Sequence, residues 1–270
     1  MVIESSLGFA LREGKRQPAI FVGHGSPMNA IQSNRFTNGW RKFGQSVPAP
    51  AAIVSISAHW QTRGGTFVTS NPHPKIIYDM YGFPDELYRI QYPARGLPII
   101  ADQLNQLSPS LPIRSTTEWG LDHGTWSVLV HMYPEANIPV VQLSMNADLR
   151  PEEHYELGGQ LRALRKRGVL IIGSGNIVHN LRLRREISNP FDWAIEFDKR
   201  IAQSIEDREF TAAVDYQHMG RLAQLAHPTN EHYLPLLYVL GLATENEGMN
   251  WFNEGITKGC LGMRCLKIGS

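Results

Sequence analysis

The sequence predicts an α/β protein: a single-domain, three-layer α/β/α sandwich around a mixed, mainly parallel sheet. Short apolar runs of β type alternate with longer segments that have helical apolar spacing, a pattern typical of α/β folds. The chain of 270 residues contains no linker, internal repeat or low-complexity stretch that would divide it. We therefore expect an N-terminal extension over residues 1–17 and one domain over residues 18–270.

The expected strands are short runs rich in isoleucine, valine and leucine, which are typical of buried strands. The last run alternates Leu261, Met263 and Cys265, so it is expected to close the sheet. The expected core strands cover residues 19–22, 53–57, 140–143 and 169–172, and further strands cover residues 64–69 and 260–268.

Six segments have the spacing or the end signals of helices. The fourth has the clearest signals, because Leu157, Leu161 and Leu164 recur on one helical face. Pro151 suits its first turn and Gly168 suits its C-cap. The expected helices cover residues 36–45, 98–107, 125–132, 151–167, 191–206 and 233–240.

One long segment, residues 71–96, has neither pattern and is rich in proline, glycine and aromatic residues. Irregular segments of this length usually form functional loops or flaps. The alternative is a surface loop whose aromatic side chains form a small core of their own. The aromatic residues in question are Tyr78, Tyr81, Phe83, Tyr88 and Tyr92.

Composition argues against several classes of partner. The net charge is only +1, so we expect no binding to nucleic acid or to an anionic membrane surface. No apolar run reaches the length of a membrane span. The two cysteines, Cys260 and Cys265, are too few for a disulfide framework, and an odd separation in a strand would put them on opposite faces. We expect a cytoplasmic protein, a monomer or a small homo-oligomer.

Histidines at the ends of the expected strands are the strongest functional signal. His24 follows the first strand between two glycines, and His59 follows the second strand and precedes Trp60. His179 follows the glycine-rich turn after the strand that ends near residue 172. Ligands of open α/β sheets bind beyond the carboxyl ends of the strands. Imidazoles delivered there by separate strands are therefore expected to meet around a metal ion.

Two further histidines lie at expected helix starts. His232 precedes the helix that Pro235 would begin, where the helix dipole favours the neutral imidazole that a metal requires. Glu231 is also a suitable ligand, but adjacent side chains point in different directions, so we favour His232 alone. His123 follows Asp122, which either holds its ring or caps the helix. His123 then acts as an acid, a base or a hydrogen-bond donor, or is only structural.

Other common catalytic motifs are absent. The sequence contains no His-Glu-x-x-His helix, Cys-x-x-Cys pair, Walker-type loop or Gly-x-Ser-x-Gly elbow. Nothing marks Ser26 as an activated nucleophile, and it is placed to cap or support its loop. Zinc and iron both accept a set of imidazole ligands.

Five short motifs carry these residues in one order along the chain. They are Gly23-His24-Gly25-Ser26-Pro27-Met28, Ser57-Ala58-His59-Trp60, Asp122-His123-Gly124-Thr125-Trp126, Gly175-Asn176-Ile177-Val178-His179-Asn180 and Glu231-His232-Tyr233-Leu234-Pro235-Leu236. Together they resemble the 4,5-DOPA extradiol dioxygenase family. That family belongs to the class III extradiol ring-cleaving dioxygenases and is related to the catalytic subunit of protocatechuate 4,5-dioxygenase.

The resemblance implies roles for the histidines. His24, His59 and His232 would be metal ligands, and His179 would be either a fourth ligand or the catalytic base. His123 would be a second catalytic histidine near the substrate and O₂. The related two-subunit enzymes use a glutamate where this chain most readily offers His232. We expect Fe(II) for catalysis and Zn(II) in the purified protein, since an all-histidine ligand set suits zinc.

The implied reaction inserts O₂ into a catechol-type substrate, DOPA-like or related, and gives a ring-opened semialdehyde. The partners are thus a small aromatic diol and O₂. Two alternatives remain: a zinc-dependent hydrolase, in which Glu231 would act as base, and a non-catalytic metal-binding protein on the same scaffold. The residues expected to contact the substrate are Ser26, Trp60, Tyr78, Phe83 and Tyr233.

Overall fold

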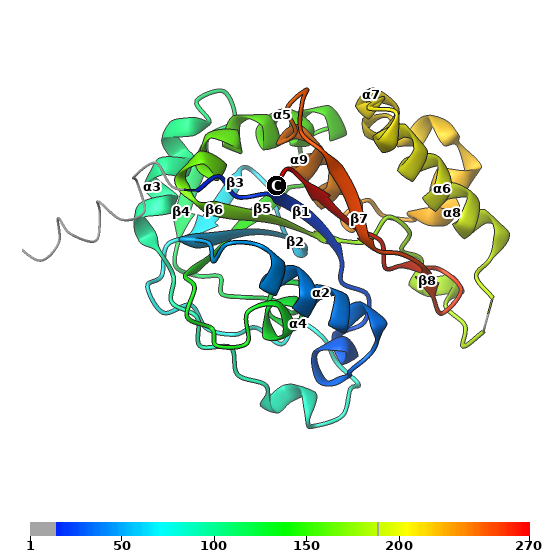
Figure 1. Ribbon diagram of the computed structural model, residues 1–270, viewed down its shortest axis with the longest axis horizontal. Helices are drawn as coiled ribbons and strands as arrows, with labels where there is room; N and C mark the ends of the chain where they lie inside the picture. Colours follow the sequence, from blue (N-terminus) through cyan, green and yellow to red (C-terminus); the bar gives the residue numbers. More distant parts are fainter. Residues whose placement is uncertain (1–14, 188) are drawn as a thin grey trace, which may run out of the picture.

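A computed structural model describes residues 15–187 and 189–270 (Figure 1). Within these residues, eight strands form one mixed sheet in the order β4-β3-β5-β2-β6-β1-β10-β7. The four neighbouring strands β5, β2, β6 and β1 are parallel, whereas β10 pairs antiparallel with β1, and β3 antiparallel with β5. The strands are β1 Ala19–Gly23, β2 Ala52–Thr62, β3 Thr66–Thr69, β4 Ile113–Thr116, β5 Val140–Asn146, β6 Val169–Gly175, β7 Met249–Asn253 and β10 Cys265–Ile268.

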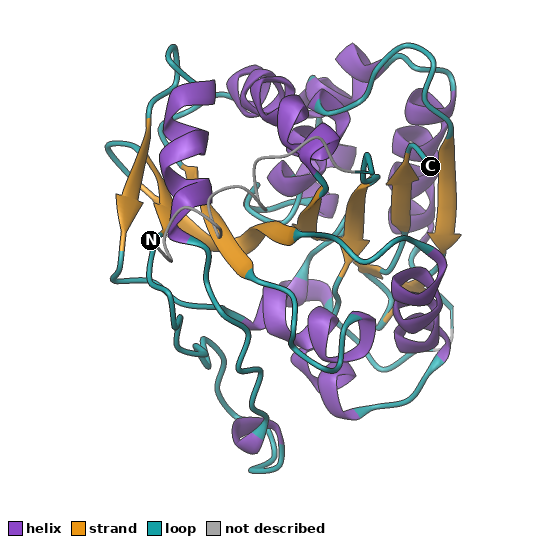
Figure 2. Cartoon of the chain, turned by 60° about the vertical axis from the view of Figure 1, so that its left-hand side comes forward, coloured by secondary structure: helices purple, strands orange, loops and turns teal. Residues whose placement is uncertain are grey.

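Helices cover both faces of the sheet, as the two views in Figures 1 and 2 show. One face packs on α2 (Arg35–Ser46) and α4 (His123–Met132). The other face carries α3 (Pro98–Leu107), α5 (Pro151–Gln160), α6 (Asp192–Glu206), α7 (Phe210–Val214), α8 (Arg221–Ala226) and α9 (Leu234–Gly241). The three-layer sandwich around a mixed sheet is therefore confirmed.

Alternating side chains of each central strand reach the two cores. Ile20 and Val22 of β1 belong to the cluster under α2 and α4, whereas Ala19 and Phe21 belong to the cluster on the opposite face. Strands buried on both faces need apolar residues at every position. This is why β1 reads as a continuous apolar run.

All six expected helices are present, and α3 has the bounds that were expected. The expected helix 151–167 ends as an α-helix at Gln160 and continues as the 3₁₀ helix Leu161–Arg167, and Gly168 ends it with a positive φ of 78°. The other described 3₁₀ helices are Pro27–Ile31, Leu87–Arg89, Leu181–Leu183 and Tyr216–Met219. Apart from Leu87–Arg89, segment 71–96 has no regular helix or extended strand, as its composition predicts.

The prediction of one continuous strand over residues 260–268 is wrong. Its first part, β9 (Leu261–Gly262), pairs with β8 (Ile256–Thr257) in a separate two-stranded sheet, and only β10 joins the main sheet. Sequence reasoning also missed β4, β7, α7 and α8. In β4 only Ile113 is fully buried, so this edge strand has little apolar pattern to detect.

Most of the expected N-terminal extension, residues 1–14, lies outside the described residues. Gln17 is already held to the body of the protein, because its backbone N–H donates to Arg165 O at 2.9 Å and its carbonyl accepts from Arg165 Nε at 2.9 Å. The boundary at residue 18 stays a prediction.

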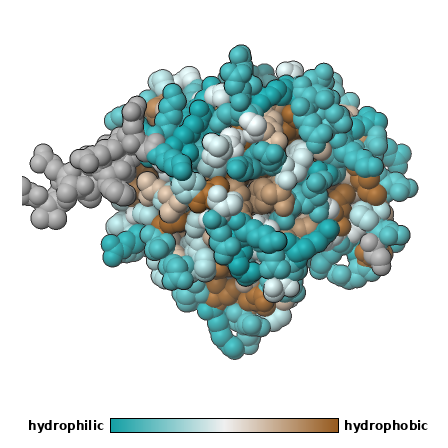
Figure 3. Space-filling view, in the orientation of Figure 1, coloured by the Kyte–Doolittle hydropathy of each residue, from teal (hydrophilic) through white to brown (hydrophobic). Residues whose placement is uncertain are grey.

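In the part of the chain that the structure describes, no helix has both the length and the apolar character needed to span a bilayer. On the face shown in Figure 3, hydrophobic residues form small separate patches among hydrophilic ones. Extended exposed apolar surface would indicate a docking site for another apolar surface. This view shows none.

Helices α5 and α9 approach each other through glycines. A Cβ atom added to Gly158 would lie 2.2 Å from the carbonyl oxygen of Tyr238, and one added to Gly241 would lie 2.1 Å from that of Tyr155. At the adjacent Gly159 the nearest atom would be 3.5 Å away, an ordinary contact. Close helix packing here fixes α9, whose start lies beside His232.

We expect Gly158→Ala to lower the free energy of unfolding by about 2–3 kcal/mol, because a backbone carbonyl must move to admit the methyl group. Gly159→Ala is the matched control, and it should raise stability by about 0.5–1 kcal/mol through helix propensity. Urea unfolding of both variants measures this difference. Equal effects of the two substitutions would contradict the close-packing argument.

Candidate functional site

Three neighbouring parallel strands deliver three histidines to the same edge of the sheet. His24 directly follows β1, and its backbone N–H donates to Gly175 O at the end of β6 at 3.0 Å. His179 lies four residues beyond the end of β6 and forms an isolated bridge with Leu261. His59 lies inside β2, which is longer than expected, at a register shift between Ile56 and Gln61. The carboxyl ends of these strands thus meet, as the fold class predicts.

A glycine at the end of β6 admits the fourth histidine. A Cβ atom on Gly175 would lie 2.1 Å from His232 O, and the N–H of Asn176 donates to that oxygen at 2.8 Å. Any larger residue at position 175 would displace the backbone of His232. His232 precedes the start of α9 by two residues, close to the expected helix N-terminus.

The fifth histidine begins α4. His123 is the first residue of that helix, two residues before the expected start, and the Asp122 carboxylate caps the helix by accepting from Thr125 N at 3.2 Å. A Cβ atom on Gly124 would lie 2.9 Å from the ring of His59. The glycine therefore lets the His59 ring lie against the first turn of α4.

The five rings line one cavity of about 420 Å³. Three are spaced evenly, with ring centroids 5.1 Å apart for His24 and His59, 5.4 Å for His24 and His232, and 5.1 Å for His59 and His232. Imidazole nitrogens about 2.0–2.1 Å from a tetrahedral ion place their ring centroids about 5 Å apart. These three rings therefore have the spacing of ligands around one ion.

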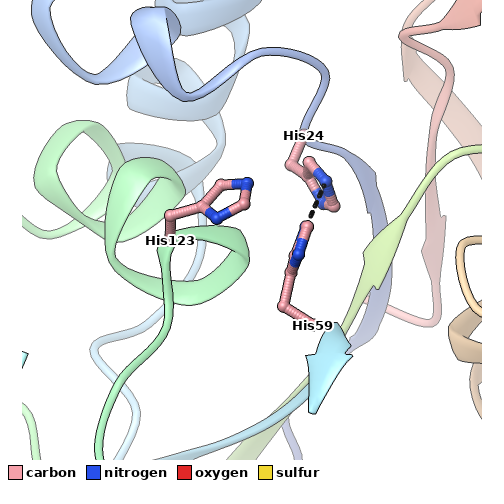
Figure 4. Close-up of side chains that lie close together, drawn as sticks. All are labelled: His24, His59 and His123. Carbon is pink, nitrogen blue, oxygen red and sulfur yellow. Dashed lines mark hydrogen bonds between the residues drawn. The ribbon is translucent and has the colours of Figure 1, made fainter. Parts of the chain in front are cut away.

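The other two rings pack against that trio. His179 stacks on His232 at 3.4 Å with an interplanar angle of 7°, and His123 lies 3.8 Å from His59. Figure 4 shows His123 approaching from α4 while His24 and His59 face each other. Ligand atoms of His24, His59 and His123 also lie within 4.8 Å of one another. The close stacking on His232 favours a place beside an ion for His179, whereas the rings of His59 and His123 are tilted by 49°.

The hydrogen bonds of Ser174 define the proton position on His24. Ser174 Oγ donates to Gly124 O at 2.6 Å, so its single hydrogen is used. Toward His24 Nδ1, 3.0 Å away, the same oxygen must therefore accept. His24 then carries its proton on Nδ1, and Nε2 offers a lone pair to the cavity.

Asp79 likewise keeps the proton of His59 on Nδ1, and it also holds the ring of His123. Its Oδ2 lies 3.2 Å from His59 Nδ1 and 2.8 Å from His123 Nδ1, and its Oδ1 accepts from the backbone N–H of His123 at 2.8 Å. A carboxylate at Nδ1 keeps the proton there and aims Nε2 away from it. Asp79, and not Asp122, is thus the carboxylate that holds the His123 ring.

Sequence reasoning missed Asp79, because it lies in the irregular segment 71–96 and neither a strand end nor a motif marks it. Glu231 was weighed as a ligand, but its Oε1 lies 3.0 Å from His232 Nδ1. It does not line the histidine cavity. Its position is that of a carboxylate that orients His232.

Burial lowers the pKa of four of these histidines and keeps their rings neutral. Burial, followed by the neighbouring imidazoles, holds the pKa of His24 and His232 well below the ordinary value. Burial lowers the pKa of His59 to about 3 and that of His179 to about 4. Burial alone would raise the pKa of Asp79, but hydrogen bonds from His123 and the adjacent rings lower it. Neutral imidazoles and anionic carboxylates are what a metal centre needs.

The distance between the Nε2 atoms of His24 and His59 indicates whether a metal ion fits between these rings. His24 Nε2 and His59 Nε2 lie 3.2 Å apart, and both carry lone pairs if the protons are on Nδ1. Two such lone pairs repel each other unless a cation or a proton lies between them. Two nitrogens bound to one tetrahedral zinc ion are about 3.3 Å apart. The residues present therefore fit a divalent ion that prefers nitrogen ligands.

The expected substrate-contact residues divide into two groups. Ser26 and Phe83 line the cavity, and Ser26 also caps the following 3₁₀ helix by accepting from Met28 N at 3.3 Å. The other three do not line it. The prediction is therefore wrong in placing Trp60, Tyr78 and Tyr233 at this cavity.

Each of these three side chains is used elsewhere in the fold. Trp60 stacks on Trp119 at 5.4 Å, and Tyr78 donates its hydroxyl to Ile90 O at 2.5 Å. Tyr233 is fully buried and donates to Ala213 O at 2.7 Å. Trp60 and Tyr233 were predicted at the cavity because each adjoins a histidine in sequence. Neighbouring side chains point in different directions, however, so the histidine lines the cavity and its neighbour does not.

Comparisons with known proteins agree with this geometry. Residues 18–261 match the family model described as the catalytic LigB subunit of aromatic ring-opening dioxygenase. The chain is 44% identical over 261 residues to the 4,5-DOPA dioxygenase extradiol of Escherichia coli K12, covering 94% of this chain and 95% of that protein. It is 36% identical to the protein of the same name from Beta vulgaris, covering 87% of this chain and 90% of that one.

A solved structure is also similar. The crystal structure of an uncharacterized protein from Escherichia coli K12 superposes with a TM-score of 0.83 at 40% sequence identity, covering 94% of this chain and 100% of that one. The fold observed here is therefore shared over nearly the whole chain.

We expect Asp79→Asn to weaken zinc binding about 10- to 100-fold, because the amide cannot hold the proton on both Nδ1 atoms as the carboxylate does. Competition with a fluorescent chelator measures the affinity. Asp85→Asn is the control, since the Asp85 side chain lies in the same segment and is 90% exposed. If Asp79→Asn binds zinc as tightly as this control, Asp79 does not orient the ligands.

The metal-free protein should lose stability as the pH falls below about 6.5. The pKa of His59 is lowered to about 3, and those of His179, His154 and His227 to about 4. Below the unfolded value of about 6.5, the unfolded chain therefore binds protons that the folded chain does not. Each such histidine contributes up to about 1.4 kcal/mol per pH unit. Urea unfolding at pH 7.5 and pH 5 tests this, and equal stabilities would contradict it.

Proposed function

We propose that this chain, which belongs to the family of catalytic LigB subunits of aromatic ring-opening dioxygenases, cleaves a catechol-type substrate beside its diol and gives a semialdehyde. The observation that supports this most directly is the convergence of five histidines on one cavity of about 420 Å³, a volume suited to a small ligand. Both oxygen atoms of O₂ enter the ring-opened product, so the reaction requires no co-reductant.

His24, His59 and His232 are the proposed metal ligands. Their even spacing and the lone pairs of His24 and His59 support this assignment. We propose Fe(II) as the catalytic ion and Zn(II) as an ion that the purified protein also binds. When bound, Fe(II) would supply coordination positions for the diol oxygens and for O₂.

His179 is the proposed base. It lines the cavity, stacks on His232 and is kept unprotonated at neutral pH, since burial lowers its pKa to about 4. A neutral imidazole beside the bound diol can accept a hydroxyl proton. The stacking distance of 3.4 Å suits a neighbour of a ligand better than a fourth ligand.

His123 is the proposed second proton carrier. Its Nδ1 faces Asp79 Oδ2 at 2.8 Å, so the carboxylate stabilises the imidazolium that forms when Nε2 accepts a proton. The same proton can return to an oxygen of the substrate as the ring opens. Asp79 therefore sets the ring orientation of His123 as well as that of His59.

The hydrolase alternative is less well supported. A zinc hydrolase needs a free carboxylate beside the bound water, but Asp79 and Glu231 both face histidine Nδ1 atoms. We also propose a cytoplasmic protein that is a monomer or a small homo-oligomer. Both cysteines are unpaired and buried, as expected in a reducing compartment.

Anaerobic loading with Fe(II), followed by addition of a catechol and then O₂, tests the reaction. DOPA, caffeate and protocatechuate are suitable first substrates. We expect one O₂ to be consumed per catechol, together with a yellow ring-opened product. Ester or amide hydrolysis without O₂ would favour the hydrolase, and tight metal binding without any turnover would favour a non-catalytic protein.

We expect His179→Gln to lower kcat by about 10²- to 10⁴-fold while iron content stays normal, because a base is removed and the ligands remain. His24→Ala should instead lose bound iron. His218→Gln is the control, since the His218 side chain is 81% exposed. Full turnover by His179→Gln with normal iron would refute its assignment as base, and loss of iron would identify it as a ligand.

A further inference from the structure

Two cationic side chains lie at the histidine cavity and have no part in the chemistry proposed above. Among the described residues that line this cavity, Arg184 and Lys258 are the only lysine or arginine. The only cavity carboxylate in the same set is Asp79, which is engaged with His59 and His123. No free carboxylate among these lining residues therefore offsets the charge of Arg184 and Lys258.

Backbone hydrogen bonds fasten the segment that carries Arg184 to the turn that carries Lys258. The N–H of Arg185 donates to Lys258 O at 3.1 Å, and the N–H of Phe191 donates to Gly259 O at 3.0 Å. The chain after His179 is thus fastened to the turn between β8 and β9. These backbone contacts keep the two segments together, and both Arg184 and Lys258 line the same cavity.

Lys258 occupies a backbone position that lysine rarely takes. Its φ is +51° and that of Gly259 is +78°, and Cys260 N donates to Thr257 O at 3.1 Å across the turn. Tight turns with two positive φ values favour asparagine, aspartate or glycine at the first of these positions. Costly backbone choices of this kind gather at functional sites. The turn keeps a cation where asparagine would be more stable.

The partners of the two cations leave them accessible. Lys258 Nζ lies 3.0 Å from Glu186 Oε1, but the Glu186 side chain is 79% exposed. Such an exposed ion pair exchanges readily with another anion. Arg184 has no acidic side chain within ion-pair distance in the described ranges.

Large apolar side chains complete this part of the cavity. Tyr81 is 92% exposed and Leu181 is 53% exposed, and both line the cavity. Exposed apolar groups of this size at a pocket are typical of ligand contacts. Histidines, apolar groups and cations together match a ligand that has a diol, an aromatic ring and an anionic group.

We propose that Arg184 and Lys258 form an anion-recognition site that selects aromatic diols carrying a carboxylate-bearing substituent. This inference rests on the proposed ring-cleaving function and adds the charge of its substrate. The substituent carboxylate replaces Glu186 at Lys258 and accepts charge-assisted hydrogen bonds from Arg184. Glu186 is then a competitor of the substrate.

The test compares 3-(3,4-dihydroxyphenyl)propionate with its primary amide, which keeps the diol and the shape but lacks the charge. We expect the native protein to show a KM about tenfold lower for the acid than for the amide. Arg184→Gln and Lys258→Asn should each move this ratio toward one by about three- to tenfold. Higher ionic strength should also reduce the ratio in the native protein.

Two further variants separate recognition from folding. Lys258→Asn suits the turn, so its melting temperature should stay equal or rise while acid preference falls. Glu186→Gln should act in the opposite direction and lower the KM for the acid. Arg182→Gln is the matched control, since Arg182 is exposed in the same segment but does not line the cavity.

Binding of both compounds to the zinc-loaded protein, measured by calorimetry, gives the same comparison without turnover. A preference for the acid that Arg184→Gln and Lys258→Asn reduce would support the anion site even if no ring cleavage occurred. Equal affinity for acid and amide, or a preference that all variants keep, would overturn it. Ring cleavage of both compounds at equal KM would leave the dioxygenase function standing and refute the anion site alone.

Discussion

The site depends on holding imidazole lone pairs toward one another. His24 Nε2 and His59 Nε2 lie 3.2 Å apart, an arrangement that two neutral rings with their protons on Nδ1 would not adopt freely. The protein enforces it from outside, because Ser174 and Asp79 take the Nδ1 side of these rings. The energy for this comes from the fold, since Ser174 lies in β6, a strand that is buried along its whole length. A divalent ion at the proposed site would relieve a repulsion that the scaffold has already imposed.

The groups that orient the ligands come from different parts of the fold. Ser174 belongs to the sheet, Glu231 adjoins the proposed ligand His232, and Asp79 belongs to the irregular segment 71–96. The same segment supplies Phe83 to the cavity wall. A movement of segment 71–96 would therefore alter both the substrate wall and the orientation of His59 and His123. In the proposed site, Asp79 would therefore link substrate contact to the geometry of the metal ligands.

Sequence reasoning succeeded where local patterns have one physical cause. Apolar runs predicted the central strands because these are buried on both faces, and strand ends predicted His24, His59 and His179 because parallel strands end at one edge. It failed at Asp79, whose role depends on a contact across 44 residues with His123. It also failed at Trp60 and Tyr233, since proximity in sequence does not tell which way a side chain points.

The division of the site between sheet and loops bears on what family membership can establish. The proposed ligands His24 and His59 are placed by strands of the central sheet. Arg184 and Lys258 lie instead in a loop and a tight turn that the sheet does not constrain. Such segments change without disturbing the core. Shared ancestry therefore supports the ring-opening chemistry strongly, while the choice among aromatic diols has to be argued from the residues of each chain.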